Sequence, residues 1–401
     1  MNTIKQSVNG IPVKRHQKII SKLLREKYAT NFFNNFESVK NFLNSKIKMD
    51  TGKYCNARCS FCYYYDSLKD DDRLTLDNVK NTNLENVLIN TGMIEFSGGE
   101  PTLVKDLPDI MNYLISKKYY LTKNDQLYFG IVTNGTNLKG FIEALKSYEK
   151  MYLIGRLSSV LISLHGSKSV HDNITKLNGS YDKIRIAVNY LKRTYPNILV
   201  RINVVLTGQH IDKEFLELLK SYVENGIQIN LLPLNFWEDT KIEANYDKIY
   251  NDVNTIMDYI YSNSLTVADN NYKSKYGAHL VNIRYIRLCK LDPKYHKFAV
   301  NHFDHLFDKL DWNKVWYPKY KHGINIYPNK KLTKESLIEA YVRDAEVSHY
   351  IGDICKSCPD FKNLKCDGLK YIDQENHIVD SDLEDFQFRT NYINKRELDA
   401  I

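Results

Sequence analysis

Three cysteines near the amino end, Cys55, Cys59 and Cys62 in the segment CNARCSFC, have the types and spacing to do chemistry. Spacings of four and three residues let one loop place three thiolates around a single metal centre, and soft thiolates select zinc, copper or iron–sulfur clusters. Three protein ligands on a four-iron cluster leave one iron open to another ligand, whereas a structural zinc site normally takes four. The alternative left by this spacing is a zinc site with a fourth ligand from elsewhere.

A second set of cysteines lies in the last third of the chain, where Cys355 and Cys358 form a CxxC pair and Cys366 follows. Cys289 lies upstream, separated from Cys355 by 65 residues. The total of seven is odd, and the amino terminus lacks the apolar core of a secretory signal, which argues against a disulfide framework. Four thiolates suffice for one [4Fe-4S] cluster or for one structural zinc. The long gap puts Cys289 in doubt as a ligand.

A glycine-rich motif, FSGGEPTL, follows Cys62 by about 36 residues. Gly98 and Gly99 let backbone groups approach a ligand closely, and Glu100 can offer a carboxylate to an ammonium group. Taken alone, the motif could also be a simple turn. Its place after the cysteine segment favours a shared site.

The elements that must position these motifs form a regular series from Lys46 to Leu234. Short β-prone runs alternate with helix-like stretches, a pattern typical of a parallel α/β sheet. We predict a partial (β/α)6 barrel, in which active sites lie at the carboxyl ends of the strands. The cysteine loop follows the first strand and FSGGEPTL ends the second. The six runs are KIKMDTG, MIEFSGG, LYFGIVTNG, SVLISLHG, ILVRINVVLT and IQINLLPL.

Four of these strands carry one polar and one apolar face, because residues two apart share a face. Helices should cover the apolar face and leave the polar face inward. A closed barrel fills its interior with Val, Ile and Leu, so a polar interior predicts an open barrel that holds a polar ligand. The alternative is that some of these are edge strands facing water. The polar pairs are Glu95 with Ser97, Ser163 with His165, Arg201 with Asn203, and Gln228 with Asn230.

The two motifs together, over roughly residues 46–235, resemble the CxxxCxxC and GGEP motifs of the radical S-adenosylmethionine (SAM) superfamily. The resemblance implies that Cys55, Cys59 and Cys62 are the catalytic residues and hold a [4Fe-4S] cluster, whose fourth iron chelates the amine and carboxylate of SAM. One-electron reduction would cleave SAM to methionine and a 5′-deoxyadenosyl radical, which abstracts hydrogen from a substrate carbon. The cofactor-binding residues implied by the resemblance are Phe61, Gly98, Gly99, Glu100, Pro101, Thr133, Asn134, Ser163 and Asn203.

Two residues on the polar face, Arg201 and His165, are not needed by this generic chemistry. An inward arginine is costly to bury unless it meets an anion or hydrogen-bond acceptors. We therefore expect Arg201 to contact an anionic or strongly polar substrate group, with His165 nearby. The alternatives are an ion pair of Arg201 with Glu95 or Asp50, and a structural hydrogen bond at His165.

The last part of the chain loses the strand–helix rhythm and opens with a probable long helix. Its cysteines resemble those of the auxiliary-cluster domains called twitch and SPASM, and the count fits the one-cluster type. The resemblance implies a second [4Fe-4S] cluster on Cys289, Cys355, Cys358 and Cys366, with structural zinc as the alternative. The expected organisation is a helical segment over 1–46, the partial barrel over 47–236, and a helical connection with an α+β auxiliary-cluster domain over 237–401.

Composition narrows the function further. The net charge of +8 is modest for 401 residues and does not indicate nucleic acid, and no apolar run could span a membrane, which predicts a cytoplasmic protein. We expect a radical SAM enzyme acting on a small polar molecule, such as a sugar, nucleoside or amino acid, with flavodoxin or ferredoxin as electron donor. The alternatives are a peptide maturase, although the first 46 residues look helical and too short for the usual β-rich leader-binding domain, and a non-enzymatic metal-binding module.

Overall fold

The computed structural model contains two compact units. One comprises Lys46–Val300 with Asn325–Lys331, and the other Met1–Ser45, Asn301–Ile324 and Leu332–Ile401. The structure describes residues 7–8, 11–12, 47–62, 64–68, 71–82, 84–89, 91–148, 153–234, 245–263, 280–284, 291–300, 325–326, 351–352 and 379–380.

In the second unit, the described residues form two antiparallel strand pairs. β1 (Ser7–Val8) pairs with β2 (Ile11–Pro12), and β12 (Ile351–Gly352) pairs with β13 (Val379–Asp380). The stretches expected to be helical within residues 1–46 lie outside the described residues. So do all four cysteines of the predicted auxiliary site, Cys289, Cys355, Cys358 and Cys366.

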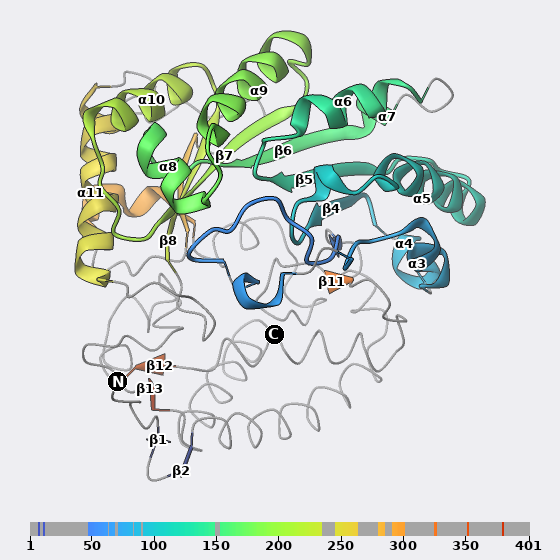
Figure 1. The fold of residues 1–401 in the computed structure, drawn as a ribbon, viewed down its shortest axis with the longest axis horizontal. Coiled ribbons are helices and arrows are strands. Elements are labelled where there is room, and N and C mark those ends of the chain that lie inside the picture. Colours follow the sequence, from blue (N-terminus) through green and yellow to red (C-terminus); the bar gives the residue numbers. More distant parts are fainter. Residues whose placement is uncertain are drawn as a thin grey trace, which may run out of the picture. The chain divides into compact units, whose positions relative to one another are not determined.

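The first unit is built on a parallel sheet with the strand order β10-β9-β8-β7-β6-β5-β4-β3-β11 (Figure 1). All six predicted strands form, each beside the next along the chain, so the predicted α/β fold of a partial barrel is confirmed. β4, β6, β7 and β8 each lie between two neighbours, so the edge-strand alternative is wrong for them. The six are β3 (Ile47–Asp50), β4 (Met93–Ser97), β5 (Tyr128–Thr133), β6 (Leu157–Ser163), β7 (Leu199–Leu206) and β8 (Gln228–Pro233).

Three short strands that the sequence analysis did not predict extend this sheet at its two ends. β9 (Val281–Arg284) pairs with β8, and β10 (Ala299–Val300) pairs with β9. At the other end, β11 (Asn325–Ile326) pairs in parallel with β3.

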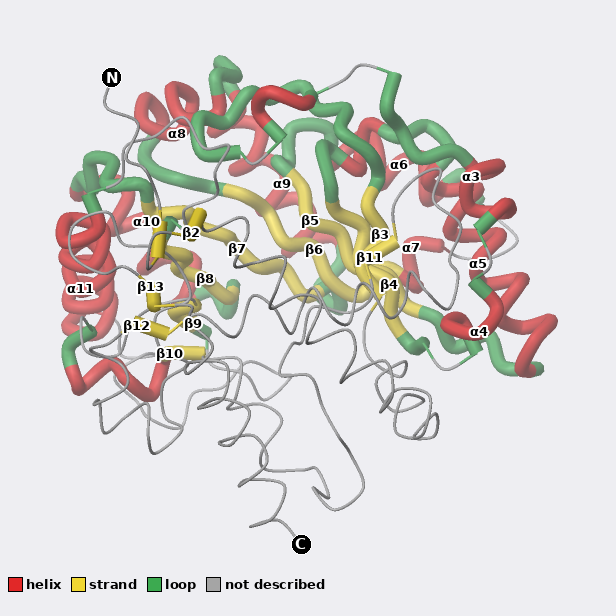
Figure 2. Tube along the Cα trace, turned by 90° about the horizontal axis from the view of Figure 1, so that it is seen from below, coloured by secondary structure: helices red, strands yellow, loops and turns green. Residues whose placement is uncertain are grey.

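Helices follow most strands and cover one face of the sheet (Figure 2). In α9, for example, Ile184, Val188 and Leu191 recur at helical spacing and are at most 1% exposed, and α10 begins where the Asp212 side chain accepts a hydrogen bond from the Phe215 amide. The helices are α3 (Leu76–Asn81), α4 (Glu85–Leu88), α5 (Leu107–Thr122), α6 (Leu138–Lys146), α7 (Leu153–Arg156), α8 (Lys168–Thr175), α9 (Ser180–Thr194), α10 (Lys213–Glu224) and α11 (Tyr246–Asn263). Among the described helices, none has the length and apolar character to cross a membrane.

The strand register separates two faces. Ile94, Ile162, Ile202 and Ile229, from four different strands, share the helix-covered face and are completely buried. On the opposite face, which we call the inner face, Ser163 aligns with Asn203 and Asn203 with Asn230. The predicted division into a polar and an apolar face is therefore present, and the carboxyl ends of the strands carry the polar face toward the cysteine loop.

Candidate active site

The cysteine loop leaves β3 through a tight turn at Gly52. This residue has a positive φ of 94°, and a Cβ placed there would lie 2.1 Å from the Asp72 carbonyl oxygen, so only glycine fits. Asp50 fixes both sides of the turn. Its Oδ1 accepts a hydrogen bond from the Gly52 amide at 2.8 Å, and its Oδ2 accepts one from the Tyr64 hydroxyl at 2.5 Å.

The middle of the loop is anchored on the end of helix α8. The Arg58 amide donates to the Thr175 carbonyl oxygen at 2.9 Å, and the Ser60 amide donates to the Ile174 carbonyl oxygen at 3.1 Å. Carbonyls in the last turn of a helix have no partner within the helix, so the loop satisfies groups that would otherwise need water or a cap. The position of the cysteines is therefore tied to α8 as well as to β3.

The three thiols lie near one another in this loop, and each is partly exposed. Backbone amides already point at two of the sulfurs: Ala57 N–H donates to Cys55 Sγ, and Tyr64 N–H donates to Cys62 Sγ, both at 3.4 Å. Burial, with added repulsion from Glu100 and Cys62, raises the pKa of the Cys55 thiol to about 11. Burial, with added repulsion from Cys62 and Cys55, also raises the pKa of Cys59.

These features fit a cluster that takes three thiolates. A bound metal centre reverses the effect of burial, because a coordinating thiol is deprotonated outright. Within the described ranges, no three Cys, His, Asp or Glu side chains are arranged to hold a single metal ion. A four-iron cluster is larger than one ion and takes its thiolates from correspondingly wider positions. The soft sulfur donors and the amides directed at them match such a cluster in chemical type.

The glycine-rich motif is joined to the cysteine loop by backbone hydrogen bonds. Gly99 N–H donates to the Gly52 carbonyl at 2.8 Å, and Glu100 N–H donates to the Tyr54 carbonyl at 2.8 Å. A Cβ on Gly99 would lie 2.0 Å from the Tyr54 oxygen, and one on Gly98, whose φ is 126°, would lie 2.7 Å from Asp50 Oδ1. In this structure the two glycines permit close approach of the two loops, a role the sequence analysis did not anticipate beside their expected approach to a ligand.

Glu100 is almost completely buried and connects the second strand end to the third. Its Oε1 accepts hydrogen bonds from the Thr102 amide at 3.0 Å and from the hydroxyls of Thr102 and Thr133 at 2.6 Å each. Its Oε2 accepts one from the Asn134 amide at 2.6 Å, which leaves acceptor capacity at this oxygen. Burial raises the pKa of the Glu100 carboxyl, while these hydrogen bonds oppose that rise. Pro101, which begins the turn η2 (Pro101–Leu103), is also buried.

The third strand end, TNGT, completes the wall beside Cys55. Thr133 is aligned with Ile162 and so lies on the helix-covered face, where its hydroxyl bonds Glu100. The side-chain Nδ2 of Asn134 donates to Asn56 Oδ1 at 2.8 Å and lies 3.9 Å from Cys55 Sγ. Asn56 and Thr136, joined at 3.0 Å, were not among the predicted site residues. The sequence feature that could have identified them is an amide side chain inside the cysteine segment and a hydroxyl side chain inside TNGT.

Behind the loop, Phe61 packs against a pair of buried histidines. Its ring meets that of His165 edge-on at 4.8 Å, and His165 stacks on His171 at 5.5 Å. His165 Nδ1 accepts a hydrogen bond from the Val205 amide, and His171 Nδ1 accepts one from the His165 amide, both at 3.1 Å. Burial lowers the pKa of His165 well below its usual range and that of His171 to about 4, so both rings are neutral at pH 7. His165 thus makes the structural hydrogen bond that the sequence left as its alternative.

On the inner face, Arg201 forms the internal ion pair that the sequence left as an alternative to a substrate contact. Its guanidinium lies 3.6 Å from the Glu95 carboxylate and donates to the Ser159 hydroxyl at 3.3 Å. Ser163 and Asn203 are half-buried and side by side at the carboxyl ends of β6 and β7. These two predicted cofactor residues are therefore together, at the end of the sheet where the cysteine loop begins.

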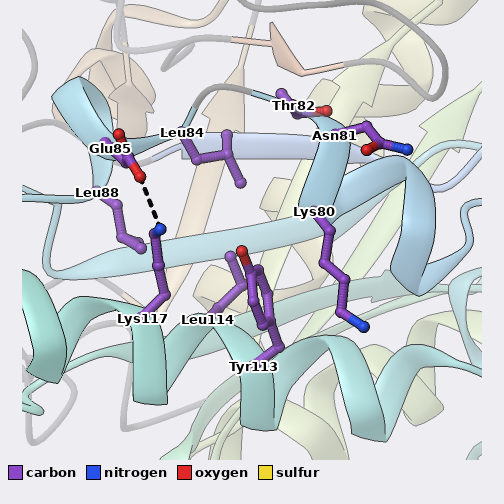
Figure 3. Close-up of a pocket in the computed structure, with 9 residues that line it drawn as sticks. All are labelled: Lys80, Asn81, Thr82, Leu84, Glu85, Leu88, Tyr113, Leu114 and Lys117. Atoms are coloured by element: carbon purple, nitrogen blue, oxygen red, sulfur yellow. Dashed lines mark ion pairs between the residues drawn. The ribbon is translucent and has the colours of Figure 1, made fainter.

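A cavity of about 230 Å³ lies elsewhere, among α3, α4 and α5 (Figure 3). Lys117 and Glu85 form an ion pair at 2.6 Å within it, beside Tyr113 and Lys80. Its lining includes none of the predicted site residues, so this cavity is separate from the cysteine site.

This chain is similar to a family of proteins and to several known enzymes. Residues 49–231 match the radical SAM superfamily. The chain is 32% identical over 173 residues to the cysteine-type anaerobic sulfatase-maturating enzyme of Clostridium novyi. The matched region covers 40% of this chain and 43% of that relative. It is 24% identical over 180 residues to the S-adenosylmethionine-dependent nucleotide dehydratase of Selenomonas ruminantium, covering 42% and 59%. The chain thus spans less than two thirds of the length of these relatives.

Two solved structures share the fold at low sequence identity. The enzyme anSMEcpe with bound AdoMet is 17% identical, with a TM-score of 0.53 over 88% of this chain and 98% of that one. Streptococcus suis SuiB bound to S-adenosylmethionine is 16% identical, with a TM-score of 0.52 over 82% and 76%. The family match, the fold and the joined cysteine and glycine loops agree, and residues 49–231 of this chain form a radical SAM superfamily domain.

Proposed function

We propose that this enzyme reductively cleaves SAM at a [4Fe-4S] cluster held by Cys55, Cys59 and Cys62 and directs the resulting radical at a polar substrate on the inner face. When bound, the cluster passes one electron from an external donor, such as reduced flavodoxin or ferredoxin, into SAM, which yields methionine and a 5′-deoxyadenosyl radical able to take hydrogen from carbon. The remaining tasks, binding, orientation and exclusion of water, belong to the chain's own residues.

The observation that carries this proposal is the physical joining of the two motif loops. Gly99 and Glu100 donate backbone hydrogen bonds to Gly52 and Tyr54, which brings a carboxylate with spare acceptor capacity beside the thiols. The amides of Ala57 and Tyr64 would stabilise thiolates at Cys55 and Cys62.

The neighbouring groups supply a polar surface for SAM. We assign to its binding Glu100 Oε2, for the ammonium group, and the half-buried side chains of Asn134, Ser163 and Asn203. Phe61 would contribute from the loop itself, held in place by His165. Gly98 and Pro101 shape the turn that holds Glu100, and Thr133 acts through its hydrogen bond to that carboxylate.

Two substrate classes remain candidates, each with its own support. The inner face carries hydroxyl, amide and charged groups from four adjacent strands, which suits a small polar molecule such as a sugar, nucleoside or amino acid. A peptide substrate is supported by the relative from Clostridium novyi, named as a sulfatase-maturating enzyme, which is 32% identical over the matched region. The small polar molecule is the class that the geometry favours, because the support for it comes from this chain's own side chains.

A second [4Fe-4S] cluster is proposed for the carboxy-terminal part, on Cys355, Cys358 and Cys366 with Cys289 as the fourth ligand. This proposal rests on the cysteine pattern, and it assigns these cysteines to an auxiliary-cluster domain over 237–401 that follows a radical SAM barrel over 47–236. An auxiliary cluster could accept an electron from a product radical or anchor a substrate. Structural zinc is the competing occupant.

The test of the proposed chemistry is cofactor cleavage. Protein reconstituted without oxygen should convert SAM to 5′-deoxyadenosine when a strong reductant is added, measured by liquid chromatography and mass spectrometry. Replacing Cys55, Cys59 and Cys62 together by Ala should abolish this product. Undiminished cleavage in the triple variant would show that the assignment of these cysteines is wrong.

Iron content tests the second cluster separately. The reconstituted protein should bind about eight irons, as two four-iron clusters, and the triple cysteine variant about four. About four irons with one equivalent of zinc in the unaltered protein would exclude the auxiliary cluster and leave the radical site intact.

A further inference from the structure

Four uncharged polar side chains form a row across the inner face, in register with the last residue of β6. Ser163 of β6 is in register with Asn203 of β7, Asn203 with Asn230 of β8, and Asn230 with Asn282 of β9. Neighbouring strands lie about 4.8 Å apart, so the row spans about 14 Å. We call these four residues the amide row; Asn230 and Asn282 were not among the predicted site residues.

The row is open at one end and closed at the other. Ser163 and Asn203 are half-buried, whereas Asn230 is 0% and Asn282 is 4% exposed. A ligand would therefore reach the row from the Ser163 side, near the cysteine loop, and extend toward Asn230.

Asn230 carries a buried side-chain donor that has no acceptor among the residues the structure describes. Its Oδ1 accepts a hydrogen bond from Asn282 Nδ2 at 3.3 Å, which directs its own NH2 group away from Asn282. Within the described ranges, this Nδ2 atom is buried without a hydrogen-bond partner. An unmet buried donor lowers stability, and such groups are retained where a ligand completes them.

Charge selects the kind of ligand. The amide row contains no ionisable side chain, so an anion on it would lose its hydration without gaining an ion pair from the row. Arg201, two residues before Asn203 on the same face, is held by Glu95 and Ser159. Only an uncharged oxygen, such as an amide carbonyl or a hydroxyl, matches the Asn230 donor without this penalty.

We propose that Asn230, supported by Asn282, binds an uncharged carbonyl or hydroxyl oxygen of the substrate. The inference rests on the proposed function, which places the substrate on the inner face, and it replaces the anionic group first expected opposite Arg201. The substrate class is a molecule whose inserted end is neutral: a peptide that offers a backbone amide, or a nucleoside or sugar that offers a hydroxyl.

The competing interpretation is structural, since the Asn230–Asn282 hydrogen bond could serve only to join β8 to β9. Probe affinity separates the two interpretations, and replacing both partners by apolar residues of similar size shows whether stability needs the pair, because this exchange leaves neither amide unpaired. The thermal midpoint of Asn230→Leu/Asn282→Leu should equal or exceed that of the unaltered protein. The matched control is Asn112→Leu in α5, because Asn112 also has a buried side-chain atom without a partner but lies outside the inner face.

The binding test uses two probe pairs that differ by one anionic group, with reconstituted, SAM-loaded protein and isothermal titration calorimetry. The pairs are N-acetyl-trialanine amide with N-acetyl-trialanine, and guanosine with guanosine monophosphate. The unaltered protein should prefer the neutral member of one pair, and the preferred pair distinguishes a peptide source from a nucleoside source. Asn230→Leu should lower the affinity for that probe by about threefold to tenfold, which corresponds to the loss of one neutral hydrogen bond. Asn112→Leu should leave this affinity unchanged.

Several outcomes would overturn the proposal: preference for the anionic members, binding of none of the four probes, or full affinity in Asn230→Leu. A lower thermal midpoint in the double variant together with unchanged probe affinity would assign the pair to strand joining. Formation of 5′-deoxyadenosine without any probe is measured in the same preparation. If it is absent, the proposed function has failed; if it is present while the neutral probes fail, only the amide row assignment is wrong.

Discussion

On the helix-covered face, Ile94, Phe96, Ile131, Ile162 and Ile202 are completely buried. The same strands present to the inner face a different set of side chains, with carboxylates, a guanidinium, hydroxyls and amides at alternate positions: Asp50, Glu95, Ser159, Arg201, Asn203 and Asn230.

The difference shows that the two faces of one sheet have different roles, one in stability and the other in binding. Apolar area removed from water stabilises the fold roughly in proportion to that area, so the helix-covered face carries the stability. Buried polar groups on the inner face cost stability unless each is paired, and Asn230 is not fully paired. Substitutions that open a cavity on the first face should therefore destabilise the protein, whereas those on the second should chiefly alter what it binds unless they leave a buried charge unpaired.

The largest effect is expected from Phe96→Ala, on the helix-covered face. Phe96 is fully buried and stacks on Phe129 with ring centroids 5.7 Å apart, so truncation leaves a cavity and should lower the free energy of unfolding by about 3–5 kcal/mol. Urea unfolding would measure this. The control is the adjacent Ser97→Ala on the inner face, which should cost about 0.5 kcal/mol or less. Equal losses at the two positions would remove the distinction between the faces.

The next effect concerns the ion pair that crosses the inner face. Arg201→Ala leaves the Glu95 carboxylate buried without its cation and should cost about 3 kcal/mol of unfolding free energy. Arg201→Met combined with Glu95→Leu removes both charges and should recover most of this loss. If Arg201→Ala instead keeps its stability and its cleavage of SAM but forms no product from substrate, Arg201 contacts the substrate after all.

The histidine pair should make stability depend on pH. Burial holds the folded-state pKa of His171 at about 4, below the unfolded value of about 6.5, so the unfolded state binds more protons between these values. The contribution is present above pH 6.5 and is lost as pH falls toward 4, by about 3 kcal/mol in all. Thermal midpoints from pH 7 to 5 should fall less steeply in His171→Asn, whose side chain still offers an acceptor to the His165 amide. Parallel slopes for the two proteins would mean that His171 is not neutral when folded.

The sequence predicted the six central strands because short β-prone runs alternate with helix-like stretches, and four of these runs carry one polar and one apolar face. It also predicted which residues share the inner face, since a period of two follows from strand geometry alone. It did not predict β9, β10 and β11, because runs of two to four residues carry no measurable period and their pairing depends on distant partners.

Within the site, the motif residues could be predicted but their partners could not. The spacing of CNARCSFC identified the thiols. The hydrogen bond that anchors this loop on α8 joins Arg58 to Thr175, and no local sequence pattern connects these two residues. The sequence could not decide which partner Arg201 has, because the Glu95 carboxylate and a substrate anion would both satisfy its charge. Only the distances in the structure distinguish them. His165 was expected to follow the parity of β6, but the strand ends at Ser163 and the ring turns to Phe61.

The central claim, that the cysteine loop holds a cluster with one iron open to SAM, is tested most directly by electron paramagnetic resonance of the dithionite-reduced protein. Subtracting the spectrum of the variant with Cys55, Cys59 and Cys62 replaced by Ala isolates the signal of this cluster from any auxiliary one. The account predicts a [4Fe-4S]⁺ signal in that difference spectrum whose g-values shift when SAM is added. A difference spectrum without an iron–sulfur signal, or one that SAM leaves unchanged, would contradict it.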